Sequence, residues 1–194
     1  MTTTQKASDL ALITKTFVEA TGRIEDIYFQ LPVAGLEDPL FRERVYCYEL
    51  YHQMRVRWPK VVYRITGEVD KKGHPWVYHG PLDYSKPDFT IHVPGRMADN
   101  LLVIEVKAVY KAKAVNPSDE QIVTDLRKLT GYRKTADYFA ACYLIYGCTE
   151  ADAAGFVNRC CQLAENDNEV DLTLIKLFHH AKALAPATEV AWPN

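Results

Sequence analysis

The chain has 194 residues, of which 48% are hydrophobic and 25% are charged, and its formal net charge is −2. This length suffices for one well-buried core and is short for two, so we expect a single domain over residues 1–194. The charge balance excludes a basic protein that coats duplex DNA and a disordered acidic tail. Any contact with nucleic acid must therefore depend on local patches.

The cysteines and the hydrophobic runs indicate the compartment. Five cysteines are present without a CxxC pair, which fits neither a disulfide framework nor a structural zinc site. Residues 1–9 are polar and rich in threonine, and no apolar run reaches the roughly 18 residues that a membrane span requires. We therefore expect a cytoplasmic protein that has no membrane partner.

The first segment predicts a helix. Ser8 or Asp9 is placed to cap it, and Gly22 is placed to end it. Its apolar residues recur at helical spacing, and they are Leu10, Ile13, Phe17 and Ala20. We expect this helix to cover one flank of the core.

A second helix is predicted from Asp38 to about Arg57. Asp38 is a suitable N-cap, Pro39 suits the first helical position, and residues 58–59 stop the helix. The stripe that we expect to be buried consists of Phe41, Val45, Glu49, His52 and Val56. Glu49 thus places a carboxylate in the middle of the face that packs on the core.

Three strands are expected next. Residues 61–69 are β-branched and aromatic, and the turn-like residues 70–73 predict a hairpin that returns through residues 76–78. Residues 88–93 alternate, with Phe89, Ile91 and Val93 on one face and Asp88, Thr90 and His92 on the other. Residues 101–109 are apolar on both faces until Glu105, which is typical of a central strand.

The remaining chain predicts alternating helices and strands. A helix begins near residues 116–118, buries Ile122, Leu126 and Leu129, and ends at Gly131 or a turn later; a strand follows over residues 138–146. Thr149 with Asp152 resembles a capping box that opens a helix to about Ala164, and residues 170–178 form the last expected strand, capped at its end by His179 and His180. This order indicates an α/β or α+β fold.

Four residues of this layout suggest hydrolytic chemistry. Successive side chains of a strand point to opposite faces, so Glu105 and Lys107 must project on the same side of the sheet. Asp88 begins the preceding strand after Pro87, and Glu49 comes from a helix. Carboxylates suit Mg²⁺ or Mn²⁺, which acidifies a bound water and polarises a phosphate. We therefore expect Asp88 and Glu105 to bind metal and Lys107 to orient the nucleophile or stabilise charge.

Pro87-Asp88, followed after sixteen residues by Glu105-Val106-Lys107, resembles the signature of the PD-(D/E)XK nuclease superfamily. The resemblance covers about residues 39–146 and implies a restriction-endonuclease-like core, in which helices flank a mixed central sheet. The elements of this core follow the order α-βββ-α-β. An N-terminal helix and a C-terminal α-β addition extend the core. It implies Glu49, Asp88, Glu105 and Lys107 as catalytic residues and Asp88, Glu105, Glu49 and the Val106 carbonyl as metal ligands. Gln121, Arg127 and Lys128 on the next helix are the positions that would contact substrate.

The resemblance implies an Mg²⁺- or Mn²⁺-dependent nuclease that hydrolyses DNA rather than RNA, in microbial or phage restriction, defence or repair. It is compatible with a homodimer in which two sites address two strands, and it leaves room for an unidentified partner protein. The alternatives are a catalytically inactive nuclease-fold protein that binds nucleic acid or assembles with partners, and a structural protein whose Asp88, Glu105 and Lys107 form an ionic network. A cofactor-dependent α/β enzyme is disfavoured because the chain has no glycine-rich phosphate loop.

Other residues compete for these roles. Asp70-Lys71-Lys72 repeats the acidic-x-Lys pattern, but we expect a solvated turn there. Glu68, on the first of the predicted strands, is a substitute for Glu49 as the third acid of the site. His52 and His92 are expected to be structural. Tyr46, Tyr48 and Tyr51 share one predicted helix, where aromatic rings serve the core or stack on unpaired bases.

Overall fold

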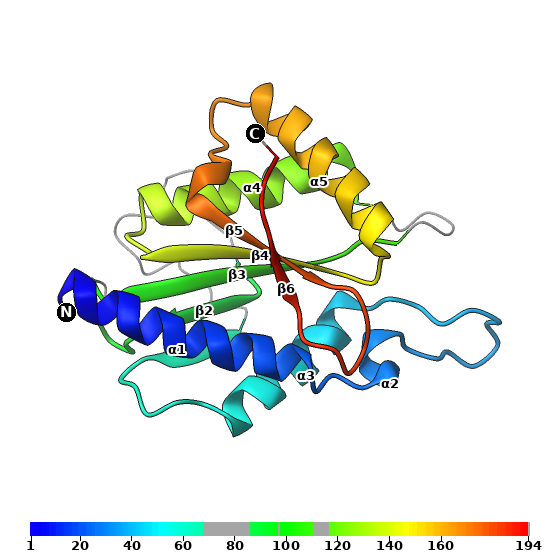
Figure 1. Cartoon of the computed structure of the whole chain (residues 1–194), viewed down its shortest axis with the longest axis horizontal. Coiled ribbons are helices and arrows are strands. Elements are labelled where there is room, and N and C mark those ends of the chain that lie inside the picture. The colour runs from blue at the N-terminus through cyan, green and yellow to red at the C-terminus, as the bar shows by residue number, and fades with distance from the viewer. Residues whose placement is uncertain (68–85, 97, 111–116, 194) are drawn as a thin grey trace.

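The computed structural model describes residues 1–67, 86–96, 98–110 and 117–193. Its centre is a six-stranded mixed sheet in the order β1-β2-β3-β4-β5-β6, with helices on both faces (Figure 1). The strands are Arg64–Gly67 (β1), Phe89–His92 (β2), Asn100–Ala108 (β3), Ala140–Tyr146 (β4), Ile175–His180 (β5) and Thr188–Val190 (β6). The helices are Thr3–Thr21 (α1), Asp26–Phe29 (α2), Glu43–Val56 (α3), Asp119–Lys134 (α4) and Glu150–Glu165 (α5). The predicted mixed α/β architecture is therefore confirmed.

The strands run in both directions. β2 is antiparallel to both of its neighbours, β1 and β3, whereas β3, β4 and β5 are parallel and are joined through α4 and α5. β6 returns antiparallel to β5. Parallel neighbours need a crossover of helix length, which explains why helices separate these central strands in the sequence.

β3 lies at the centre and divides the core into two. Leu102, Ile104 and Val106 pack with residues of α1 and α3, whereas Val103 packs with residues of α4 and α5. Figure 1 shows the same two layers, with α1 and α3 on one face of the sheet and α4 and α5 on the other. The alternation from Val103 onward therefore assigns Glu105 and Lys107 to the α4 face.

The start of α1 differs from the prediction. The helix begins at Thr3, and Thr2 is its N-cap, whose side chain accepts a hydrogen bond from the Gln5 N–H. The proposed caps Ser8 and Asp9 lie inside the helix, where the Asp9 carboxylate accepts from the Gln5 side chain. The prediction was wrong because an earlier threonine already supplies the side-chain oxygen that a first turn needs.

The start and the buried face of α3 also differ from the prediction. Leu40 forms an antiparallel bridge with Leu31, which holds the chain extended there, so the first helical residue is Glu43 instead of Pro39. Phe41 precedes the helix, so its position does not indicate which residues of the helix face the core. The buried residues are Tyr46, Cys47, Leu50 and Met54, whereas the predicted His52 and Val56 are exposed.

The elements that position the site match the prediction closely. β2, β3, α4, β4 and α5 lie within about two residues of their predicted bounds, and Ser118 and Thr149 cap α4 and α5. The predicted last strand begins late, because a 3-10 turn over Leu172–Leu174 precedes β5, and β6 and α2 were not predicted. His179 and His180 lie within β5 and are buried, so they do not cap a final strand.

Two predictions fall outside the described residues. They are the hairpin through residues 70–78, with its Asp70-Lys71-Lys72 triplet, and the alternative acid Glu68. Within the described residues, no helix combines the length and the apolar character that crossing a membrane would require.

Candidate functional site

Two carboxylates bind the main chain at the end of β3. β2 begins at Phe89, which pairs with Ile104, whereas β3 continues to Ala108. The Val106 N–H donates to Asp88 Oδ2 at 2.7 Å, and the Ala108 N–H donates to Glu43 Oε1 at 3.1 Å. Side chains thus satisfy the donors that a neighbouring strand would otherwise satisfy.

Asp88 and Glu105 are neighbours across the two strands. They flank the Phe89–Ile104 pair, and Glu105 is only 4% exposed. Burial, reinforced by the charge of Asp88, raises the pKa of Glu105 well above its ordinary value. Burial also raises the pKa of Asp88, although the hydrogen bond from Val106 opposes this. Two carboxylates held this close repel each other when both are ionised, and a cation bound between them would offset this repulsion.

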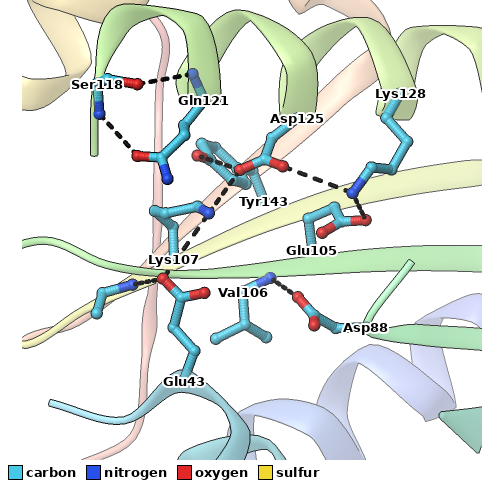
Figure 2. A network of polar contacts seen from close by, with 11 residues as sticks. Glu43, Asp88, Glu105, Val106, Lys107, Ser118, Gln121, Asp125, Lys128 and Tyr143 are labelled. Atoms are coloured by element: carbon cyan, nitrogen blue, oxygen red, sulfur yellow. Dashed lines mark hydrogen bonds and ion pairs between the residues drawn. The ribbon is translucent and has the colours of Figure 1, made fainter. Parts of the chain in front are cut away.

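α4 contributes a carboxylate, Asp125, and an ammonium, Lys128, on the face of the sheet where Glu105 and Lys107 project. The Lys107 ammonium lies 2.8 Å from Asp125 Oδ2, and the Lys128 ammonium lies 2.8 Å from Glu105 Oε1. Lys128 also lies 3.5 Å from Asp125 Oδ1, so Asp125 bridges both lysines. Figure 2 shows Glu105 and Lys107 pointing from β3 towards Asp125 and Lys128 on α4.

The burial pattern of α4 explains the position of Asp125. Ile122, Leu126 and Leu129 face the sheet, and Asp125 lies three residues after Ile122 on that same face. The Tyr143 hydroxyl on β4 donates to Asp125 Oδ2 at 3.4 Å. A carboxylate that is buried in this way needs charged and hydrogen-bonding partners, and Lys107 and Lys128 supply the charge.

Glu43 completes the set from α3. Its Oε1 lies 3.7 Å from the Lys107 ammonium, in addition to the bond from Ala108. Burial raises the pKa of Glu43, and the nearby Lys107 reduces this effect. Burial lowers the pKa of Lys107, but Asp125 and Glu43 outweigh it and raise that pKa above its ordinary value. Lys107 is therefore a cation at neutral pH.

Glu43, rather than the predicted Glu49, lies beside Lys107. Glu49 accepts a hydrogen bond from the Gln53 side chain on its own helix. Six residues at 3.6 residues per turn rotate Glu49 roughly 120° away from Glu43 around α3. The sequence does not point to Glu43, because the predicted helix begins four residues too early, at Pro39, and its predicted buried face is based on Phe41, which lies before the observed helix.

The substrate-contacting residues predicted on α4 separate into three groups. Lys128 joins the cluster through Glu105. Gln121 is exposed, and its side chain closes the capping box with Ser118, on the part of α4 above Lys107 (Figure 2). Arg127 points elsewhere, because it pairs with Asp167 and Glu169. Arg127 therefore does not join the cluster around Glu105 and Lys107.

Asp125 was also missed as a site residue. Its signal was present in the sequence, because a carboxylate at the spacing of a buried helical stripe is costly unless a cation meets it. The partner cation, Lys107, lies 18 residues earlier on β3, so local patterns alone do not connect the two.

The groups of the cluster that could bind a metal ion are Asp88, Glu105 and the Val106 carbonyl. Within the described ranges, no group of three or more His, Cys, Asp or Glu side chains is arranged to hold one. Mg²⁺ usually needs only one or two carboxylates, because it retains several waters. Asp88 and Glu105 provide two, and the Val106 carbonyl points to the same side of β3 as the N–H that Asp88 binds. The donor set therefore fits a partly hydrated Mg²⁺ or Mn²⁺ ion.

No protein-family model, no curated protein and no solved structure matches this chain. Function must therefore be inferred from the chemistry of the site.

Proposed function

We propose that this protein is a metal-dependent nuclease that hydrolyses DNA phosphodiester bonds with Mg²⁺ or Mn²⁺. The observation that carries the proposal is the adjacency of Asp88 and Glu105, with Lys107 two residues further along the same face of β3. A pair of carboxylates for a hard cation and an ammonium for developing negative charge are the groups that phosphodiester hydrolysis requires.

Each residue has a distinct role in the proposal. Asp88, Glu105 and the Val106 carbonyl would hold the metal, which when bound supplies charge that acidifies a water and offsets the phosphate. Lys107 would orient the nucleophile or stabilise the transition state. Asp125 positions the Lys107 ammonium at 2.8 Å, and Lys128 offsets the charge of Glu105.

The arrangement of elements supports a restriction-endonuclease-like core. α3 precedes three antiparallel strands, and α4 then leads to β4, which is parallel to β3. This is the α-βββ-α-β order that the motif implies. The proposal includes a cytoplasmic setting in microbial or phage restriction, defence or repair, and the five free cysteines support a reducing compartment.

One observation favours a second candidate, a nuclease-fold protein without catalysis that binds nucleic acid or assembles with partners. Both lysines of the cluster are already paired, Lys107 with Asp125 and Lys128 with Glu105. Removal of one partner from such a closed network destabilises a fold, so the network can be retained without any reaction. The two candidates differ in their response to metal.

Cleavage assays test the proposal. We would incubate circular and linear DNA, single- and double-stranded, with Mg²⁺, Mn²⁺ or chelator, and compare the wild type with Asp88→Asn and Lys107→Ala. Glu49→Gln is the matched control, because Glu49 lies away from Lys107 on α3. The nuclease proposal predicts metal-dependent cutting that both site variants abolish and the control retains.

Calorimetry with Mg²⁺ and Mn²⁺ separates the remaining outcomes. Absence of cutting together with absence of metal binding would refute the nuclease and favour the structural network. Metal binding that Asp88→Asn removes, without cutting of any DNA or RNA, would favour the non-catalytic candidate.

A further inference from the structure

A cavity of about 610 Å³ lies next to the carboxylate cluster. Its walls come from α3 and from the adjoining ends of β1 and β2, and they include Glu43, Asp88, Tyr48, Tyr51 and Phe89. This volume is in the range of about 300–1,000 Å³ that is usual for small-ligand sites. Because Glu43 and Asp88 belong to both the cavity and the cluster, a group in the cavity would lie beside the proposed cleavage site.

Aromatic rings give the cavity flat surfaces. Tyr51 and Phe89 lie almost parallel, with 10° between the ring planes and 6.4 Å between the centroids. Tyr48 also lines the cavity, yet 65% of it is exposed to solvent. Arg44 lies one helical turn before Tyr48 and lines the cavity as well. Aromatic rings and guanidinium planes are the groups on which unpaired bases stack.

Gly67 keeps one wall of the cavity open. It is the cross-strand partner of Phe89, so a side chain at position 67 would project on the same face as the Phe89 ring. A Cβ there would lie 3.5 Å from the Asp88 carbonyl oxygen and 3.9 Å from the nearest Phe89 ring carbon, which are ordinary contacts. Among the residues that the structure describes, none would therefore clash with the Cβ of a larger residue at position 67, which would occupy the cavity.

We propose, on the basis of the proposed nuclease function, that this cavity receives an unpaired base of single-stranded DNA whose neighbouring phosphate lies at Asp88 and Glu105. Tyr48 and Tyr51 contact the base, Phe89, which is only 2% exposed, supports the Tyr51 ring, and Arg44 lies within reach of the backbone. A base in a duplex must first leave its stack to enter such a cavity, which costs free energy. The protein therefore selects single strands, flaps or frayed ends over intact duplex.

Binding measurements test this substrate class without depending on turnover. We would titrate the protein into fluorescently labelled single-stranded DNA, the same strand with abasic sites, its duplex and the equivalent RNA strand, in Mg²⁺ and in chelator, and follow anisotropy. The single strand should bind most tightly. Tyr48→Ala and Gly67→Leu should each weaken its binding by about 5- to 100-fold, the range expected for loss of one base–aromatic stack.

Tyr28→Ala is the matched control, because Tyr28 is an exposed tyrosine on α2 that does not line the cavity. Circular dichroism would verify that each variant folds. Equal affinity for normal and abasic strands, or unchanged binding by folded Tyr48→Ala and Gly67→Leu, would overturn the base site.

The same measurements distinguish this inference from the proposed function. Metal-dependent cutting with binding that is insensitive to Tyr48 would keep the nuclease and remove the base site. Loss of single-strand binding in both cavity variants, in a protein that never cuts, would keep the base site and remove the nuclease. Tighter binding of RNA than of DNA would overturn the choice of DNA.

Discussion

Asp125 on α4 holds the ammonium of Lys107 on β3 at 2.8 Å, and the same carboxylate lies 3.5 Å from Lys128. Asp125 thus connects the helix to the strand that carries both the metal-binding acid and the lysine of the proposed site. Lys107 has a second acidic neighbour, Glu43, at 3.7 Å. The position of the Lys107 ammonium therefore depends on elements on both faces of the sheet.

Removal of the Asp125 charge should destabilise the fold. Asp125→Ala leaves two partly buried lysines without a shared acid, and breaking such a buried pair costs about 3 kcal/mol, or a fall in Tm of about 6–12 °C. Glu19→Ala is the control, because Glu19 pairs with Lys15 at the surface, where a pair contributes about 0.5 kcal/mol. Thermal unfolding of both variants measures the difference. Equal Tm values would show that Asp125 is not part of a buried network.

Glu43→Gln should reduce cleavage by about tenfold or more, in the range of a positioning or electrostatic contribution. The amide keeps a hydrogen bond from Ala108 but removes a charge from beside Lys107. Glu49→Gln should leave cleavage unchanged, because its carboxylate bonds to Gln53. Initial rates of DNA cutting, measured over a range of pH, compare the two. A larger loss in the Glu49 variant would reverse the assignment of the helical acid.

Mg²⁺ should stabilise the protein. A ligand that binds only the folded state at about 100 times its Kd adds about 2.7 kcal/mol, which raises Tm by about 5–10 °C at this chain length. Asp88→Asn should remove most of this increase, since it removes one of two carboxylate donors. Differential scanning fluorimetry with and without Mg²⁺ gives the shift. A shift that persists in Asp88→Asn would place the metal elsewhere.

His180 should make the stability depend on pH. It is fully buried on β5, and the Tyr46 hydroxyl lies 2.7 Å from its Nδ1. Burial lowers the pKa of His180 from 6.5 to about 4. The unfolded state therefore binds a proton more readily than the folded state between these values. The contribution of the neutral His180 side chain to the free energy of unfolding is present above pH 6.5 and is lost as the pH falls towards 4. It amounts to about 3 kcal/mol in total.

Urea unfolding of the wild type and of His180→Gln between pH 4 and 7 measures this contribution. The stability of the variant should change less over this range. His52→Gln is the control, because His52 is exposed on α3. Parallel pH profiles for the wild type and His180→Gln would contradict the assignment.

The central elements could be predicted because their signals are local. The alternation of β2, the apolar run of β3 and the Ser118 cap of α4 each lie within a few residues of chain. Both the Asp88–Glu105 pairing and the shared side of Glu105 and Lys107 follow from strand geometry. The motif thus identified the part of the cluster that lies on adjacent strands.

The other members of the cluster depend on contacts between distant segments. The bridge from Leu31 to Leu40 delays α3 and brings Glu43, not Glu49, to Ala108. Asp125 meets Lys107 only because α4 packs on β3, after the chain has passed through residues 111–116, which lie outside the described residues. Neither relationship appears in the residue pattern of a single element.

The bond from the Val106 N–H to Asp88 links chemistry to packing at one residue. The Val106 side chain is buried in the α1–α3 half of the core, while its backbone anchors a proposed metal ligand on the strand's edge. A smaller side chain at position 106 would let β3 shift into the space left behind, and Asp88 would shift with it because its carboxylate is bonded to the Val106 N–H. Tight packing at position 106 therefore also maintains the orientation of the Asp88 carboxylate. Val106→Ala would impair the site although it changes none of the side chains of the cluster.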